Sequence, residues 1–338
     1  MNIHAVRGTN DILPGETWKW RFLEETARKI FDVFGYEEIR TPIFENTELF
    51  IRSVGETSDI VEKQMYTIPE EGGSGLTLRP EATACVVRAF LQHELHREDR
   101  LHKLYYVGPM FRHERPQKGR LRQFHQIGVE VIGAGHPAVD AEVIGLLSQM
   151  LFEIGLEGAL FKINSVGCLS CKTNYSKILR DDLRTRLQTL CEDCQRRFEK
   201  NVLRVLDCKK AQCQEVLTQV PLLPDVICLE CRDHFNRVQN LLNQLGVKFE
   251  LAPKLVRGLD YYTRTIFEVT HSALGAQDAL AAGGRYDLLI ESMGGPPLGA
   301  VGFGAGMERL LLALGEKIKG TGPYKPLIFL ASLGEKAA

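Results

Sequence analysis

The sequence lacks any long apolar run, and no stretch approaches the roughly 20 apolar residues that a transmembrane helix needs. It also has little net charge, -1 at pH 7, because 42 Lys and Arg residues nearly balance 43 Asp and Glu residues. A generally basic nucleic-acid-binding protein is therefore excluded, and contact with a polyanion requires a local basic cluster. No charged-then-apolar leader opens the chain, so we expect a cytoplasmic protein without membrane contact.

The 338 residues are enough for one large or two smaller domains, and 44% apolar with 25% charged residues is typical of a globular protein. Positive charge is concentrated between Arg112 and Arg122, where five cationic side chains accompany one carboxylate, Glu114. The flanking segments 104–111 and 124–132 are rich in aromatic and β-branched residues, which predicts a hairpin with a long, basic loop.

Alternate residues of a strand share a face, so the second hairpin strand has one polar and one apolar face. The polar face carries Phe124, Gln126, Gly128 and Glu130, and the apolar face carries Ile127, Val129 and Val131. A solvated outer face is the simpler alternative. The attached arginine-rich loop instead favours a site for an anionic ligand.

Periodicity predicts further elements along the chain. Helices are expected at 16–34, 82–91 and 139–154, and strands at 36–44, 65–68, 76–78 and 161–166. Residues 168–245 are helical in pattern and hold eight of the nine cysteines, which indicates an insertion between two halves of a sheet.

Six stretches carry a family resemblance. One of them, TLRPEATA, is similar to the aminoacyl-tRNA synthetase segment that meets the ammonium group of the amino acid. The hairpin sequence FRHERPQKGRLRQFHQIGVE resembles motif 2 of the class II aminoacyl-tRNA synthetases, in the form most similar to histidyl-tRNA synthetases. The first helix with GYEEIRTPIFE resembles motif 1, and LGAVGFGAGMERL, which lacks the GxGxxG order, resembles motif 3. Two further strings, RGLDYYTRTIFE and AGGRYD, are similar to strings of the histidyl-tRNA synthetases. We expect AGGRYD to line the same substrate pocket as RGLDYYTRTIFE. The resemblance extends over residues 3–338.

The resemblance implies an α+β fold, in which a mixed, mainly antiparallel sheet is flanked by helices and carries a helical insertion. The expected division is 1–166 and 249–322 for the catalytic core and 167–248 for the cysteine-rich insertion. Residues 323–338 would be a linker and the start of a truncated anticodon-binding domain. The family also implies a homodimer.

The resemblance also implies roles for individual residues. ATP would be bound by Arg112, Arg120, Phe124 and Arg309, with Phe124 and Arg309 on either side of adenine. Histidine would be bound by Glu81, Ala82, Thr83, Arg112, Gln126, Glu130, Arg257, Tyr261 and Tyr262. Arg112 and Arg257 would be catalytic, and Arg115, Gln117 and Arg122 are candidates for contact with tRNA.

The implied reaction is activation of L-histidine by ATP, with Mg²⁺, followed by transfer to tRNA(His). A buried imidazole needs a partner for each ring nitrogen, and Glu130 with Tyr262 would supply them. Two alternatives remain. One is the non-catalytic histidine-sensing regulatory subunit of ATP phosphoribosyltransferase, whose members typically lose the arginines that are intact here. The other is a different class II synthetase, which the pairing of Tyr262 with Glu130 disfavours.

The cysteines have two interpretations. Without an export signal they are expected to be reduced thiols or metal ligands. Cys168, Cys171, Cys191 and Cys194 match a zinc spacing, with nineteen residues between the two pairs, and a second site is compatible with the remaining four. The insertion of the family does not generally require metal, so structural zinc is not the favoured interpretation.

Overall fold

The computed structural model describes residues 3–318 except 57, 71–72, 74 and 276–277. In this part of the chain the main sheet has eight strands in the order β1-β5-β6-β11-β10-β9-β7-β8. Their bounds are β1 Glu37–Glu38, β5 His102–Phe111, β6 Gln123–Ile132, β7 Leu160–Ser165, β8 Phe249–Leu251, β9 Thr263–Thr270, β10 Ala279–Arg285 and β11 Ala300–Gly306. Only the edge pairs β1–β5 and β7–β8 are parallel among these described strands, so the predicted mixed, mainly antiparallel sheet is confirmed.

A small antiparallel sheet lies beside the main one, in the order β2-β4-β3. Its strands are β2 Phe44–Asn46, β3 Tyr66–Ile68 and β4 Leu76–Leu78. The strand expected at 36–44 is therefore wrong in extent. Within 36–44, only β1, at the edge of the main sheet, and the first residue of β2 form strand. The segment between them contains Pro42 and carries the chain from the main sheet to the small one.

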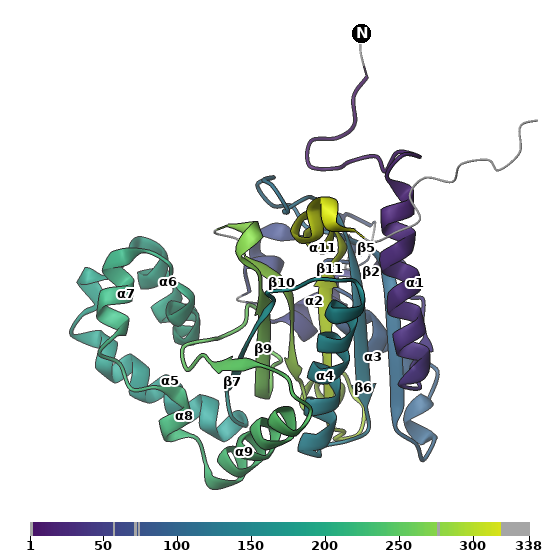
Figure 1. Cartoon of the computed structure of the whole chain (residues 1–338). Helices are drawn as coiled ribbons and strands as arrows, with labels where there is room; N and C mark the ends of the chain where they lie inside the picture. Colours follow the sequence, from purple (N-terminus) through teal and green to yellow (C-terminus); the bar gives the residue numbers. More distant parts are fainter. Residues whose placement is uncertain (1–2, 57, 71–72, 74, 276–277, 319–338) are drawn as a thin grey trace, which may run out of the picture.

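Four helices cover one face of the main sheet. They are α1 Thr17–Val33, α4 Pro137–Glu153, α9 Leu229–Gln244 and α11 Met307–Leu314. Their apolar side chains share one core with Ile127, Val129 and Val131 of β6, so the predicted apolar face of this strand is confirmed. Figure 1 shows α1 and α4 running along this face, with α2 (Thr47–Val54) and α3 (Thr83–Gln92) behind the sheet.

The insertion projects to one side of the sheet (Figure 1). It consists of α5 Leu169–Arg184, α6 Glu192–Lys200, η4 Val202–Asp207, α7 Ala211–Leu217, α8 Leu223–Val226 and the start of α9. Phe235, Val238 and Leu242 of α9 pack in the core beneath the sheet rather than with the other insertion helices. The end of the insertion at 248 therefore stays a prediction, and residues 323–338 lie outside the described part.

Among the described residues no helix is both long and apolar enough to cross a membrane.

Candidate active site

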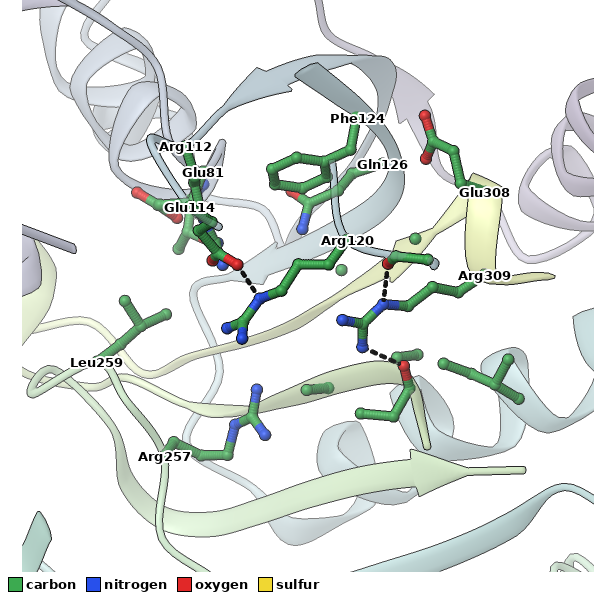
Figure 2. A pocket seen from close by; sticks show the side chains of 18 of the residues that line it. Glu81, Arg112, Glu114, Arg120, Phe124, Gln126, Arg257, Leu259, Glu308 and Arg309 are labelled. Carbon is green, nitrogen blue, oxygen red and sulfur yellow. Dashed lines mark hydrogen bonds and ion pairs between the residues drawn. The ribbon is translucent and has the colours of Figure 1, made fainter. Parts of the chain in front are cut away.

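A cavity opens on the polar face of the main sheet, opposite the helices that cover the apolar face. It is walled by β6, the hairpin loop, the start of α3, β10, the β11–α11 junction and the loop before β9 (Figure 2). Its lining includes Glu81, Thr83, Arg112, Glu114, Arg120, Phe124, Gln126, Arg257, Tyr261, Tyr262, Glu308 and Arg309. Segments far apart in the sequence therefore meet in one cavity.

Four arginine side chains reach this cavity from three segments: Arg112 and Arg120 from the hairpin loop, Arg257 from the loop before β9, and Arg309 from α11. Figure 2 shows the side chains of Arg120, Arg257 and Arg309 pointing toward one another, with Phe124 above them in the view. Backbone carbonyls fix two guanidinium groups: Nε of Arg112 donates to Pro80 O at 2.8 Å, and Nε of Arg309 donates to Gly119 O at 2.9 Å. Arg120 pairs with Glu114, and Arg257 pairs with Glu268.

The arginines destabilise one another's charge. Burial lowers the pKa of Arg309, and the charge of Arg112 lowers it further. Burial likewise lowers the pKa of Arg120, and the positive charges of Arg309 and Arg112 lower it further. Crowded, partly buried cations favour a bound polyanion, which relieves both penalties. The cavity thus suits a polyanionic ligand.

The wall opposite the arginines is formed by the start of α3 together with Tyr261 and Tyr262. Glu81 accepts hydrogen bonds from the backbone N–H groups of Thr83, at 2.8 Å, and Ala84, at 2.9 Å. It therefore complements the N-terminus of α3 and also faces the cavity. Burial raises its pKa despite these donors, so a cationic ammonium group of a ligand would favour its charged form.

Glu130 lies next to this wall and not on the cavity surface. Its side chain is 1% exposed, and it accepts hydrogen bonds from Oγ1 of Thr83 at 2.7 Å and from the Tyr286 hydroxyl at 2.6 Å. Burial raises its pKa to about 8, although both hydroxyl donors oppose the shift. Thr83 lines the cavity and donates a hydrogen bond to Glu130, so Glu130 can act on a bound ligand through Thr83. Ala82 also does not line the cavity, because it packs in an apolar cluster.

Small residues create the room for this arrangement. A Cβ atom added to Gly302 would stand 2.0 Å from Oε2 of Glu130, and one added to Gly128 would stand 2.3 Å from the Tyr106 ring. Both glycines are therefore required by close approach on the ligand side of the sheet.

The titration of Glu130 gives a testable pH dependence. Its pKa is raised from an ordinary 4.5 to about 8, so the folded protein holds a proton that the unfolded chain has lost between these values. The free energy of unfolding should therefore fall as pH rises across this window, and less so in Glu130→Gln. Urea unfolding at pH 5, 6.5 and 8 measures this difference. The exposed carboxyl variant Glu291→Gln is the control, and a pH-independent difference between wild type and Glu130→Gln would contradict the assignment.

Sequence reasoning missed Tyr106, which lines the cavity and was identifiable because alternate residues of β5 face the ligand side. Tyr286 of the AGGRYD string does not line the cavity but donates a hydrogen bond to Glu130. The AGGRYD string was expected to line the pocket, but only Ala282 of it does so. Arg285 is fully buried and bonds to Asp140, because its strand position points away from the cavity.

The hairpin loop is held from the N-terminal turn. Gly8 O accepts hydrogen bonds from the backbone N–H groups of Arg122, at 2.7 Å, and Gln123. Arg115 and Gln117 are exposed at the tip, and Arg122 is partly buried beneath it. Their contact with tRNA stays a prediction.

The eight insertion cysteines form two groups of four, and the predicted quartet is wrong. Cys168 and Cys171 lie with Cys228 and Cys231, whereas Cys191 and Cys194 lie with Cys208 and Cys213. The reason is tertiary: the start of α9 returns to the start of α5, and the η4–α7 segment packs against α6. Spacing along the chain could not reveal these pairings.

Comparisons with known proteins show the family of this chain. The family model described as Histidyl-tRNA synthetase matches residues 8–310. The chain is 50% identical to a histidine–tRNA ligase of Syntrophotalea carbinolica and 52% identical to one of Desulfitobacterium hafniense, in each case covering all of this chain and 80% of the relative. The apo histidyl-tRNA synthetase of S. aureus has a similar structure, with a TM-score of 0.76 and 38% identity over 94% of this chain and 74% of that one. The chain therefore belongs to the histidyl-tRNA synthetase family of class II aminoacyl-tRNA synthetases.

Proposed function

We propose that this protein activates L-histidine with ATP to histidyl-adenylate and transfers the histidyl group to tRNA(His). The observation that carries the proposal is the single cavity in which four arginines face a wall of Glu81, Thr83 and two tyrosines. A nucleotide and a small cationic amino acid require these two surfaces side by side.

Activation is a phosphoryl-centred displacement. A carboxylate oxygen of histidine attacks the α-phosphorus in line, the bond to the bridging oxygen breaks, and pyrophosphate leaves. No side chain has to transfer a proton in this step, so positioning and charge neutralisation dominate. Arg112 and Arg257 would hold the α-phosphate and the attacking carboxylate, and Arg120 would hold the departing phosphates.

Adenine would lie against Phe124, with Arg309 on its other side. An aromatic face accepts a base without reading its edges, and a guanidinium plane stacks in the same way. The guanidinium of Arg112 already lies 5.2 Å from the centre of the Phe124 ring, which places phosphate-binding and base-binding groups next to each other.

The histidine side chain would enter between Thr83 and Tyr262. Burial raises the pKa of Tyr262 to about 12, so its hydroxyl keeps its proton and can donate or accept. Tyr261 and Gln126 line the same space, and Glu130 acts through its bond to Thr83. A buried ring nitrogen without a hydrogen-bond partner weakens binding by about 1–3 kcal/mol, and the same penalty on the pocket's polar groups rejects side chains of similar size.

Two carboxylates, Glu114 and Glu308, lie in the part of the cavity where the phosphates of ATP would bind, and they are suitable ligands for Mg²⁺. Mg²⁺ is usually held by one or two carboxylates together with substrate phosphates. When bound it neutralises charge on the phosphates. Glu114 at present pairs with Arg120, and Glu308 accepts from the His125 backbone N–H at 3.0 Å, so both would exchange partners.

The regulatory-subunit alternative is less well supported. A structure titled as an ATP phosphoribosyltransferase regulatory subunit/histidyl-tRNA synthetase from Bacillus halodurans is similar in fold, with a TM-score of 0.69 at 24% identity. In this chain, however, Arg112, Arg257 and Arg309 all face the cavity. Homodimer formation stays a prediction from the family.

ATP–pyrophosphate exchange tests the proposal. We expect exchange that depends on L-histidine and is at least about 100-fold weaker with other amino acids, since a polar pocket rejects ligands that leave buried groups unpaired. Charging of tRNA(His) transcripts with labelled histidine tests the second step. A protein that binds histidine without any exchange would be a regulator, and exchange with another amino acid would indicate a different synthetase.

A further inference from the structure

The two cysteine groups lie outside the cavity and have no part in the reaction proposed above. The neck group consists of Cys168, Cys171, Cys228 and Cys231, where the insertion leaves and rejoins the rest of the chain. The distal group consists of Cys191, Cys194, Cys208 and Cys213, further out in the insertion. We propose that each group binds one structural zinc ion through four thiolates.

The spacing of the sulfur atoms suits a single ion. Within each group all Sγ atoms lie within 4.8 Å of one another. The distance is 3.6 Å between Cys168 and Cys171 and 3.9 Å between Cys191 and Cys208. A tetrahedral site with zinc–sulfur bonds of about 2.3 Å has sulfur–sulfur edges of about 3.8 Å. Both groups are thus close to the required shape.

Disulfide bonds do not account for these groups. All the cysteines are free in the described structure, and a separation of 3.6 Å far exceeds the roughly 2.05 Å of a sulfur–sulfur bond. Four thiols gathered at one point are also more than one disulfide can use. Tetrahedral sulfur ligation is instead typical of zinc.

Helix starts and backbone donors prepare the sulfur atoms for negative charge. Cys168, Cys191 and Cys228 directly precede α5, α6 and α9, and the second cysteine of each pair lies in the first turn. Backbone N–H groups donate across each group: Cys228 to Sγ of Cys171 at 3.1 Å, Cys168 to Sγ of Cys231 at 3.2 Å, and Cys191 to Sγ of Cys213 at 3.2 Å. Helix N-termini and N–H donors both stabilise thiolates.

The proposed ions would anchor the insertion to the wall of the cavity. Lys172, next to Cys171, donates to the backbone carbonyls of Asp260 at 2.9 Å and Tyr262 at 3.0 Å. From the distal side, Arg204 donates to Gly258 O at 3.1 Å. The loop that carries Arg257 and Tyr262 is therefore held by Lys172, next to Cys171 of the neck group, and by Arg204 of η4, the element that ends directly before Cys208 of the distal group. A metal at each group would cross-link the ends of these segments, in addition to the apolar core that the insertion helices share.

Metal analysis of the chain purified without chelator tests the proposal. We expect about two zinc ions per chain, one for each set of four thiolates. The paired variants Cys171→Ser/Cys231→Ser and Cys194→Ser/Cys213→Ser should each retain about one ion. Cys85→Ala, which removes the cysteine outside both groups, is the matched control and should retain about two. Fewer than about 0.2 zinc per chain, iron in place of zinc, or native disulfides would overturn the proposal.

A second measurement on the unaltered chain covers the case in which a variant does not fold. Replacing the bound metal by cobalt should give the absorption of tetrahedral cobalt with thiolate-to-cobalt charge transfer. The eight cysteines of the two groups should react with a thiol reagent only after a strong chelator is added. Immediate reaction of all thiols, or no thiolate–cobalt band, would count against the sites.

Discussion

Arg257→Ala is expected to lower histidine-dependent ATP–pyrophosphate exchange by at least about 100-fold, the usual effect of removing one preorganised charge donor. Nη1 of Arg257 pairs with Glu268, whereas its buried Nε has no hydrogen-bond partner among the described residues. A buried donor without a partner is costly unless a ligand supplies an acceptor. An α-phosphate or carboxylate oxygen would do so in the transition state.

The control for this variant is Arg184→Ala, on the exposed surface of α5. It removes the same charge far from the cavity and should leave exchange within about twofold, since surface substitutions of this kind have small effects. Thermal unfolding of both variants checks that the fold is intact. Exchange by Arg257→Ala close to the wild-type rate would refute the assigned role.

The local part of the site was predictable from the sequence. Period two along 124–132 gave the apolar face of β6, because the side-chain direction in a strand is fixed by the backbone. The motif resemblance gave the residues that converge on the cavity from β6, α3, α11 and the loop before β9. Their convergence is a property of the fold, which the family pattern carries and spacing alone does not.

The long-range contacts were not predictable. The cysteine pairing depends on where α9 returns to the chain, and the position of Glu130 beneath Thr83 depends on the depth of the cavity. Arg285 shows the same limit. Arg285 belongs to the AGGRYD string, which the family resemblance suggested as part of the pocket. Because side chains alternate between the two faces of β10, however, the side chain of Arg285 points toward α4.

Arg285 and Asp140 form a buried ion pair between β10 and α4. Nη2 of Arg285 donates to Asp140 at 2.8 Å, and Nη1 donates to Asp287 at 2.8 Å and to Ala134 O at 3.0 Å. Both members of the pair are 0% exposed. Burial alone would raise the pKa of Asp140, but the hydrogen bond from His234 and the charge of Arg285 hold it below its ordinary value. Asp140 is therefore charged at neutral pH and depends on its partners.

Arg285→Met should lower the free energy of unfolding at pH 7 by about 3–5 kcal/mol, because a buried carboxylate loses its counter-ion. Without that charge the pKa of Asp140 should rise, so the folded variant takes up a proton as pH falls and its deficit relative to wild type should shrink toward pH 4.5. Lost packing volume would not depend on pH. Urea unfolding at pH 7 and 4.5 separates the two causes, with Arg184→Met, which breaks an exposed pair with Asp181, as the control expected to change stability by less than about 0.5 kcal/mol. A loss similar to that control, or one unchanged between the two pH values, would show that the pair does not hold β10 against α4 through its charge.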